Sequence, residues 1–173
     1  MTAQEQEEIF RRWLGAHLGL MLKVVRGCAD PQDQDDLFQD VLVQVWSSIP
    51  AFRGEAKETT WIYRVAFNTA LAWRRGERRR REGHELFLKS EDLSQAQPSH
   101  VDSLTNQEIV EQLYAAIRQL PKVDASLALM HLDGLSYQEM AEVLGISENY
   151  IGVKLNRIRK LLADQLKGAI HEL

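Results

Sequence analysis

The chain has 173 residues, of which 45% are hydrophobic, and this length allows one medium domain or two small ones. Only 4 prolines and 10 glycines occur, a composition that suits a folded, mainly helical protein and excludes a disordered one. The formal net charge of -4 at pH 7 excludes a protein that coats nucleic acid indiscriminately, because non-specific binding follows the total attraction to phosphate.

Hydrophobic residues recur at helical spacing along almost the whole chain, and no stretch shows sustained alternation with period two. The sequence therefore predicts an all-α fold. Three helices are expected in the first half: from Ile9 to about Gly27, from behind Asp33 to about Trp46 or Ile49, and from Thr59 or Thr60 to about Arg81.

The stretch 82–104 is rich in Ser, Gln, Asp and Glu and contains Pro98, which is typical of a flexible linker, with a weakly ordered "LFL" segment inside it. Four helical segments follow it: about Thr105 to Leu120, Lys122 to Leu132, Ser136 to Leu144 and Ser147 to about Lys167. We expect a helical domain at 1–81, a linker at 82–104 and a second helical domain at 105–173.

The single cysteine, Cys28, excludes an internal disulfide and a cysteine-based metal cluster. No apolar run approaches the roughly 18 to 20 residues of a membrane span. The acidic start "MTAQEQEEIF" lacks the basic and then apolar pattern of a secretory signal. We therefore expect a cytoplasmic protein without membrane insertion.

The stretch "LSYQEMAEVLGISENYIGVKLNRIRKLL" (135–162) predicts a helix-turn-helix. Gly145 permits the positive φ of a tight turn, Ser147 caps the next helix, and the small Ala141 lets the two helices approach closely. The last helix has an apolar face of Ile151, Leu155, Ile158 and Leu162 and an opposite face of Asn149, Val153, Asn156 and Lys160, flanked by Gly152 and Arg157. Such a polar face suits the major groove of DNA. The alternative is an ordinary helical hairpin with a solvated face.

The third helix combines apolar and basic residues on one side. Ile62, Val65, Ala66, Thr69 and Trp73 share the expected core face, and Arg64, Phe67, Asn68, Leu71, Arg74, Arg75 and Arg78 stand across from them. This mixture fits single-stranded nucleic acid, whose bases stack on aromatic rings while Arg meets phosphate. Alternatively, Phe67 and Leu71 pack on a neighbouring helix. Trp61 and Tyr63, at the start of the helix, could stack on a base or staple the helix in place.

The second helix has an acidic face beside its apolar one. Asp36, Gln39, Asp40, Val43 and Trp46 lie opposite a buried stripe. An apolar anchor with a charged rim favours a protein-docking surface, and the negative charge would repel DNA. A Mg²⁺ site is the alternative, but Asp33, Asp35, Asp36 and Asp40 do not converge on one face and no phosphate-binding glycine loop accompanies them. We expect no metal, no cofactor and no catalytic residue.

Three stretches resemble the extracytoplasmic-function (ECF) sigma factors, the smallest sigma-70-family initiation factors of bacteria. They are "DLFQDVLVQVW" (36–46), "FRGEAKETTWIYRVAFNTALAWRR" (52–75) and "LPKVDASLALMHLDGLSYQEMAEVLGISENYIGVKLNRIRKLL" (120–162). The resemblance implies a sigma-2 helical bundle, a linker and a sigma-4 helix-turn-helix domain. It also implies a subunit of RNA polymerase that directs promoter recognition, promoter melting and transcription initiation.

The resemblance implies the roles of the surfaces described above. The core-polymerase contact, to the β′ clamp helices, falls on Asp36, Gln39, Asp40, Val43 and Trp46. Contact to the melted non-template strand of the minus-ten element falls on Gly54, Glu55, Ala56, Lys57, Trp61, Arg64, Phe67, Asn68, Arg74, Arg75 and Arg78. Contact to the double-stranded minus-thirty-five element, beside the β flap, falls on Asn149, Gly152, Val153, Lys154, Asn156, Arg157, Arg159 and Lys160.

One departure from the family is Gly152, where many relatives carry a basic residue, so base recognition there is expected to be weaker or based on DNA shape. Family members are usually restrained by an anti-sigma factor, and we expect such a partner by analogy. Two rival hypotheses remain. One is a stand-alone dimeric helix-turn-helix regulator that binds a palindrome without polymerase, and the other is a metal-dependent phosphotransferase that uses the Asp cluster.

Overall fold

The computed structural model describes residues 2–85 and 106–171, with side chains for 2–73 and 107–166. Helices make up its regular structure, and no strand occurs in these ranges, so the all-α prediction is confirmed. In chain order the elements are α1 (Ala3–Cys28), η1 (Pro31–Asp33), α2 (Gln34–Ser48), η2 (Ile49–Ala51), α3 (Glu58–Glu85), α4 (Asn106–Gln119), α5 (Lys122–Leu132), α6 (Tyr137–Leu144) and α7 (Glu148–His171).

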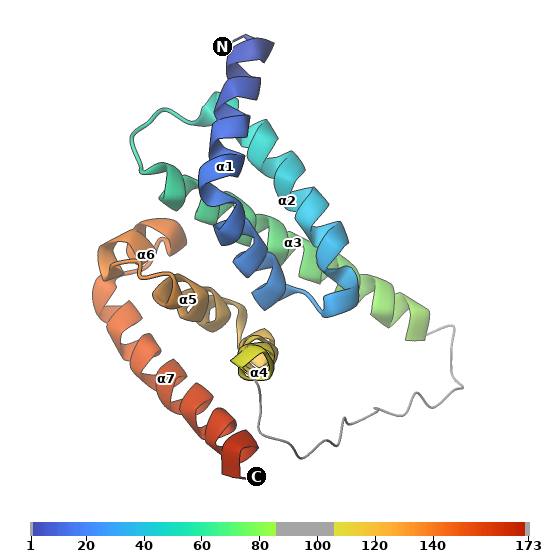
Figure 1. Ribbon diagram of the computed structural model, residues 1–173, viewed down its shortest axis with the longest axis vertical. Helices are drawn as coiled ribbons and strands as arrows, with labels where there is room; N and C mark the ends of the chain where they lie inside the picture. The colour runs from blue at the N-terminus through green and yellow to red at the C-terminus, as the bar shows by residue number, and fades with distance from the viewer. Residues whose placement is uncertain (1, 86–105, 172–173) are drawn as a thin grey trace.

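Helices α1, α2 and α3 form a first bundle, the amino-terminal unit (Figure 1). Helix α1 begins with a capping box: Thr2 Oγ1 accepts from the backbone N–H of Glu5, and the Glu5 carboxylate accepts from the backbone N–H of Thr2. The apolar stripes that were predicted from periodicity meet in the middle of this bundle. Buried there are Trp13, Met21, Val24, Leu37, Val41, Val45, Ile62 and Ala66.

Helices α4 to α7 form a second bundle, the carboxy-terminal unit. The predicted apolar face of α7 is confirmed, since Ile151, Leu155, Ile158 and Leu162 are all buried. The predicted turn is confirmed as well: Gly145 has φ 68°, and its N–H donates to the Ala141 carbonyl oxygen at 2.8 Å. Ser136 and Glu139 close a capping box at the start of α6, which fixes where that helix begins.

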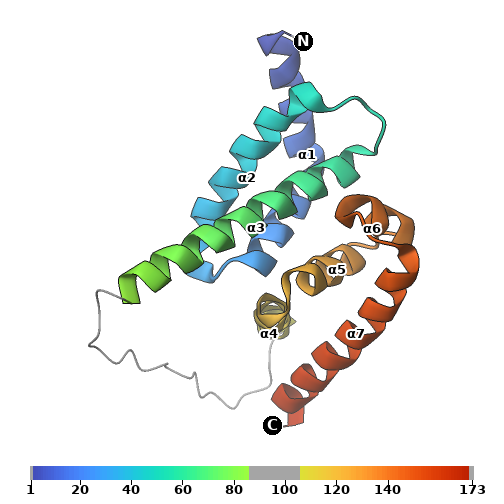
Figure 2. The same ribbon diagram turned by 180° about the vertical axis from the view of Figure 1, so that it is seen from behind.

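The two units pack directly on each other: α4 and α5 lie against α1, and α6 lies against α3 (Figures 1 and 2). The middle of helix α5 is therefore covered on all sides, and every residue from Ala125 to Met130 is buried. Helix α2 lies on the far side of the amino-terminal unit in both views. The predicted domains are thus in contact, although the sequence suggested only that a linker joins them.

The helix boundaries differ slightly from those predicted. Helix α3 extends to Glu85, past the predicted end at Arg81, because Arg and Glu are good helix formers and continue the last turns. The rest of the predicted linker, with its "LFL" segment, lies outside the described residues. No helix in the described ranges is both long enough and apolar enough to cross a bilayer.

Candidate functional site

The acidic face of α2 is open to solvent. Asp36, Gln39, Asp40 and Val43 are exposed, and the Val43 side chain is 58% exposed. Trp46 is more enclosed than predicted: its ring packs edge-on against Phe10 with 5.2 Å between centroids. An exposed apolar residue beside carboxylates is the arrangement expected of a docking surface.

The aspartates of this region do not assemble into a metal site. Within residues 2–73 and 107–166, no three side chains of His, Cys, Asp or Glu lie close enough together to hold a metal ion.

Aromatic side chains fix the loop between α2 and α3. The Phe52 ring lies 5.3 Å from the Trp13 ring and 5.6 Å from the Trp61 ring, measured between centroids. The indole Nε1 of Trp61 donates to Ser48 Oγ at 3.0 Å. Gly54, with φ 74°, turns the exposed part of the loop, where a side chain would be strained. Of the two roles considered for Trp61, holding the start of α3 in place is observed. Stacking of Trp61 on a base stays a prediction.

Lys57, at the end of this loop, is held by the carboxy-terminal unit. Its Nζ donates to Glu139 Oε1 at 2.7 Å. This bond raises the pKa of Lys57, and together with the bonds from Ser136 it lowers the pKa of Glu139 to about 2. In this arrangement a residue predicted to contact DNA is paired with a carboxylate instead.

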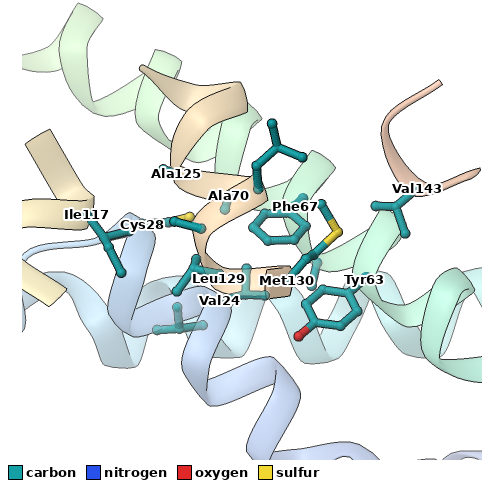
Figure 3. Close-up of a cluster of buried hydrophobic side chains, with 14 of the residues drawn as sticks. Val24, Cys28, Tyr63, Phe67, Ala70, Ile117, Ala125, Leu129, Met130 and Val143 are labelled. Atoms are coloured by element: carbon teal, nitrogen blue, oxygen red, sulfur yellow. The ribbon is translucent and has the colours of Figure 1, made fainter. Parts of the chain in front are cut away.

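The outer face of α3 is also covered. Phe67, predicted to face outward, is only 2% exposed, and its ring stacks on Tyr63 with centroids 5.5 Å apart and planes 11° apart. Figure 3 shows both rings beside Met130 of α5 and near Val143 of α6. Of the two alternatives left open for Phe67, packing on a neighbouring helix is the one observed in this arrangement, because α3 carries a second apolar side that the carboxy-terminal unit buries.

Polar residues of the same face have different surroundings. The Arg64 guanidinium donates to the backbone carbonyl oxygen of Glu142, whereas Asn68 is exposed. The side chains of Arg74, Arg75 and Arg78 lie outside the described residues. Sequence analysis did not single out Glu142 or Asp133 as partners of α3, because no local pattern links residues so far apart in the chain.

The outer face of α7 is largely free. Asn149, Asn156, Arg157, Arg159 and Lys160 are exposed, and Val153 is 56% exposed. Lys154 is an exception: its Nζ lies 2.9 Å from Asp124 Oδ1 and 5.7 Å from the centre of the Tyr150 ring. The remaining cations and amides form a polar helix face of the kind that enters a major groove.

Two tyrosines border this face, and sequence analysis missed them. Tyr150 is exposed, and Tyr137 of α6 lies beside Gly152, where an added Cβ would meet Tyr137 Cε2 at 3.5 Å. That distance is ordinary van der Waals contact, so a side chain at position 152 is sterically acceptable. Both tyrosines are visible in the sequence as aromatic residues on either side of the turn. Periodicity alone does not show whether such residues are exposed or belong to the core.

Two family models match the chain. Sigma-70 region 2 matches residues 9–80, and Sigma-70 region 4 matches residues 110–162, so the two together cover both helical units. The chain belongs to the sigma-70 family. It is an ECF-type sigma factor, and its family is not one of enzymes.

Similar curated proteins are RNA polymerase sigma factors as well. It is 26% identical over 143 residues to the ECF RNA polymerase sigma-E factor of Haemophilus influenzae, covering 78% of this chain and 75% of that protein. It is 25% identical over 162 residues to the RNA polymerase sigma-H factor of Pseudomonas aeruginosa, covering 90% of this chain and 82% of that protein.

Solved structures share the fold of this sigma factor. One is the sigma factor RpoE in complex with the anti-sigma factor NepR from Bartonella quintana, with a TM-score of 0.70 and 20% identity, over 92% of this chain and 98% of that one. Another is CnrH in complex with the cytosolic domain of CnrY, with a TM-score of 0.64 and 19% identity, over 94% and 90% of the chains.

A polar cluster joins the two units of this sigma factor. Asp133, at the end of α5, accepts from Lys23 Nζ of α1 through one carboxylate oxygen and from the Tyr63 hydroxyl of α3 through the other. Burial, the bond to Asp133 and the charge of Asp133 raise the pKa of Tyr63, and Tyr114 adds to the effect. Three helices from both units are therefore tied to one carboxylate.

The contact between the units should weaken in alkali. A raised pKa means that Tyr63 contributes fully below the ordinary tyrosine pKa of about 10 and that this contribution is lost as the pH rises above it. We expect the radius of gyration, measured by small-angle X-ray scattering, to grow above that pH. Tyr63→Phe is the control and should show a smaller pH-dependent change. Equal changes in both proteins would contradict the assignment to Tyr63.

Proposed function

We propose that this sigma factor binds core RNA polymerase through α2 and gives the enzyme promoter specificity, while the polymerase does the chemistry. The observation that carries the proposal is that one chain holds both region 2 and region 4 and that α2 and α7 present open faces of different chemistry. The α2 face is acidic and apolar, and we assign it to the β′ clamp helices. Region 4 would lie beside the β flap.

We assign the minus-ten element to the loop and α3. Gly54, Glu55, Ala56 and Lys57 would surround a flipped base of the non-template strand, and α3 would follow the strand with Arg64, Phe67, Asn68, Arg74, Arg75 and Arg78, beside Trp61. Binding unpaired bases more tightly than paired ones shifts DNA toward the open state. The aromatic anchoring of this loop supports the assignment, because a preformed loop loses little entropy on binding.

We assign the minus-thirty-five element to α7, where Asn149, Val153, Asn156 and Arg157 would approach base edges and Arg159 and Lys160 would approach phosphates. Lys154 would have to leave Asp124 to reach a phosphate. Gly152 adds no side chain to this face, which favours shape recognition at that position.

We further propose a domain plan and a regulatory partner. The matched regions, 9–80 and 110–162, fall inside the domains expected at 1–81 and 105–173, which supports this plan, with the linker beginning after α3 ends at Glu85. An anti-sigma factor as partner is supported by the two solved structures of similar fold, because each is of a complex with NepR or CnrY.

Run-off transcription tests the proposed function. Core polymerase with this chain should start transcription at aligned sites that core alone does not use. If transcription starts equally well without the chain, the proposal is wrong. A stand-alone dimeric regulator would instead retard a palindromic DNA in a gel-shift assay without polymerase. We do not expect that result, because the chain contains sigma-70 region 2.

Asn156→Ala should weaken use of the minus-thirty-five element. The side chain is exposed, so folding is unaffected, and loss of a base contact lowers promoter affinity by about 1–3 kcal/mol, or roughly 5- to 150-fold. Run-off transcription on a promoter with an intact element measures the loss. Gln165→Ala, another exposed amide on the same helix, is the control and should transcribe normally. If both variants behave alike, or if the loss persists on a promoter with that element scrambled, the assignment is contradicted.

A further inference from the structure

An ion pair inside the carboxy-terminal unit removes one cation from the outer face of α7. Lys154 Nζ lies 2.9 Å from Oδ1 of Asp124, a residue in the first turn of α5. Helices α5 and α7 pack on each other, so the pair joins two neighbours within one bundle (Figure 1). The Lys154 side chain is 25% exposed and that of Asp124 is 16% exposed, whereas Arg157, Arg159 and Lys160 lie open to solvent.

Three features hold Lys154 on Asp124. Asp124 Oδ1 is buried, so departure of Lys154 would leave a carboxylate oxygen away from water and without its opposite charge. Asp124 lies at the start of α5, where the helix dipole favours a carboxylate. The centre of the Tyr150 ring is 5.7 Å from Lys154 Nζ, which adds a cation–π attraction. The bond to Asp124 raises the pKa of Lys154, and the charge of Asp124 and the contact with Tyr150 add to this effect.

A DNA phosphate has to compete with Asp124 for Lys154. It offers the ammonium group the same kind of charge-assisted hydrogen bond that the carboxylate already supplies. Salt screens a contact on the open surface more strongly than it screens a partly buried pair. The exchange therefore gains little and leaves Asp124 uncompensated, so Lys154 remains in the ion pair when α7 meets DNA.

We propose that Asp124 is an internal counter-ion that keeps Lys154 from the DNA backbone, so that α7 binds duplex DNA with one phosphate contact fewer than its cations suggest. The inference rests on the proposed function, because it needs α7 in the major groove. Phosphate contacts supply affinity but no sequence information. Asp124 is thus a positioning residue that lowers the sequence-independent affinity of region 4. A larger share of binding then comes from the base contacts assigned to Asn149, Val153 and Asn156.

Asp124→Asn tests the internal counter-ion. This near-isosteric change removes the negative charge and frees Lys154 for a phosphate. Each phosphate contact changes the slope of log affinity against log salt concentration by about 0.9 on duplex DNA. Holoenzyme assembled from core polymerase and this variant should therefore show a slope about 0.9 steeper than wild type, and should bind roughly five- to tenfold more tightly at about 0.1 M salt.

Fluorescence anisotropy of a labelled duplex measures both the slope and the affinity. The minus-thirty-five element of the duplex is either intact or scrambled. A freed Lys154 contacts a phosphate and no base, so the gain in affinity should be the same on the two sequences. A gain confined to the intact element would contradict a phosphate contact.

Two controls separate a freed cation from a change in net charge. Asp124→Asn combined with Lys154→Met should return to the wild-type slope, because the freed cation is gone. Glu142→Gln removes an exposed carboxylate elsewhere in the same unit and should leave the slope unchanged. If Asp124→Asn steepens the slope no more than Glu142→Gln does, the inference is wrong.

Lys154→Met alone gives a second reading. Internal pairing predicts an unchanged slope, whereas a phosphate contact from Lys154 predicts a slope about 0.9 shallower. This variant leaves the carboxylate of Asp124 without its partner, so circular dichroism checks the helices before binding is measured. A shallower slope in the folded variant would overturn the inference.

Lys160→Met separates failure of this inference from failure of the proposed function. Lys160 is exposed and is assigned to a phosphate, so its loss should make the slope about 0.9 shallower. If it does so while Asp124→Asn behaves as wild type, only the internal counter-ion is overturned. If no variant changes the slope, and intact and scrambled elements bind alike, α7 does not meet duplex DNA and the assignment of the minus-thirty-five element is overturned.

Discussion

Val43→Lys should lower the affinity of the chain for core RNA polymerase by about 30-fold or more, the range of a binding hot spot. Val43 is the most exposed large apolar residue of the α2 face, on the same side of the helix as Asp36 and Asp40. Lysine removes the apolar anchor and opposes the basic partner surface that this acidic rim favours. The measurement is a fluorescence-anisotropy titration of labelled chain with core polymerase.

Folding should not change in this variant, because the Val43 side chain makes little contact with the core. Gln44→Lys is the matched control: it adds the same charge at the neighbouring exposed position, which points to the flank of the helix. The control should bind core almost normally. Equal losses in both variants would mean that net charge, and not the Val43 face, governs binding.

Much of this fold could be predicted because it follows from local rules. The apolar stripes of α2 and α7 have helical period, and both proved to be the buried faces. Gly145 and Ser147 gave the helix-turn-helix, since a positive φ and a helix N-cap are each set by a single residue and its neighbours.

The arrangement of the two units could not be predicted in the same way. Phe67 and Tyr63 form a second apolar side of α3, and sequence alone cannot say whether nucleic acid or protein covers it. The answer depends on Met130 and Asp133, about seventy residues later, so it lies in tertiary contacts and not in periodicity. Sequence patterns indicated which residues have functional chemistry. They did not show which of these residues already contact the other unit of the chain.

Trp13→Ala should lower the free energy of unfolding by about 3–5 kcal/mol, the cost of emptying a large aromatic site in a core. The Trp13 side chain is fully buried and packs edge-on against Phe52. Since small proteins are stable by only about 5–15 kcal/mol, the variant should keep its fold but melt roughly 10 °C earlier. Calorimetry measures the shift, and Leu18→Ala, on the exposed side of α1, should stay within about 0.5 kcal/mol of wild type.

Trp13→Ala should also impair promoter opening more than it impairs binding to core polymerase. Trp13 supports Phe52, and Phe52 supports Trp61, so its loss loosens the loop assigned to the flipped base while α2 keeps its docking face. Below the melting temperature, Trp13→Ala should therefore bind core polymerase normally but open promoters more slowly, as permanganate footprinting of unpaired thymines would measure. If core binding and promoter opening fall together, the loop is not selectively held by Trp13, and its preformed shape must come from other contacts.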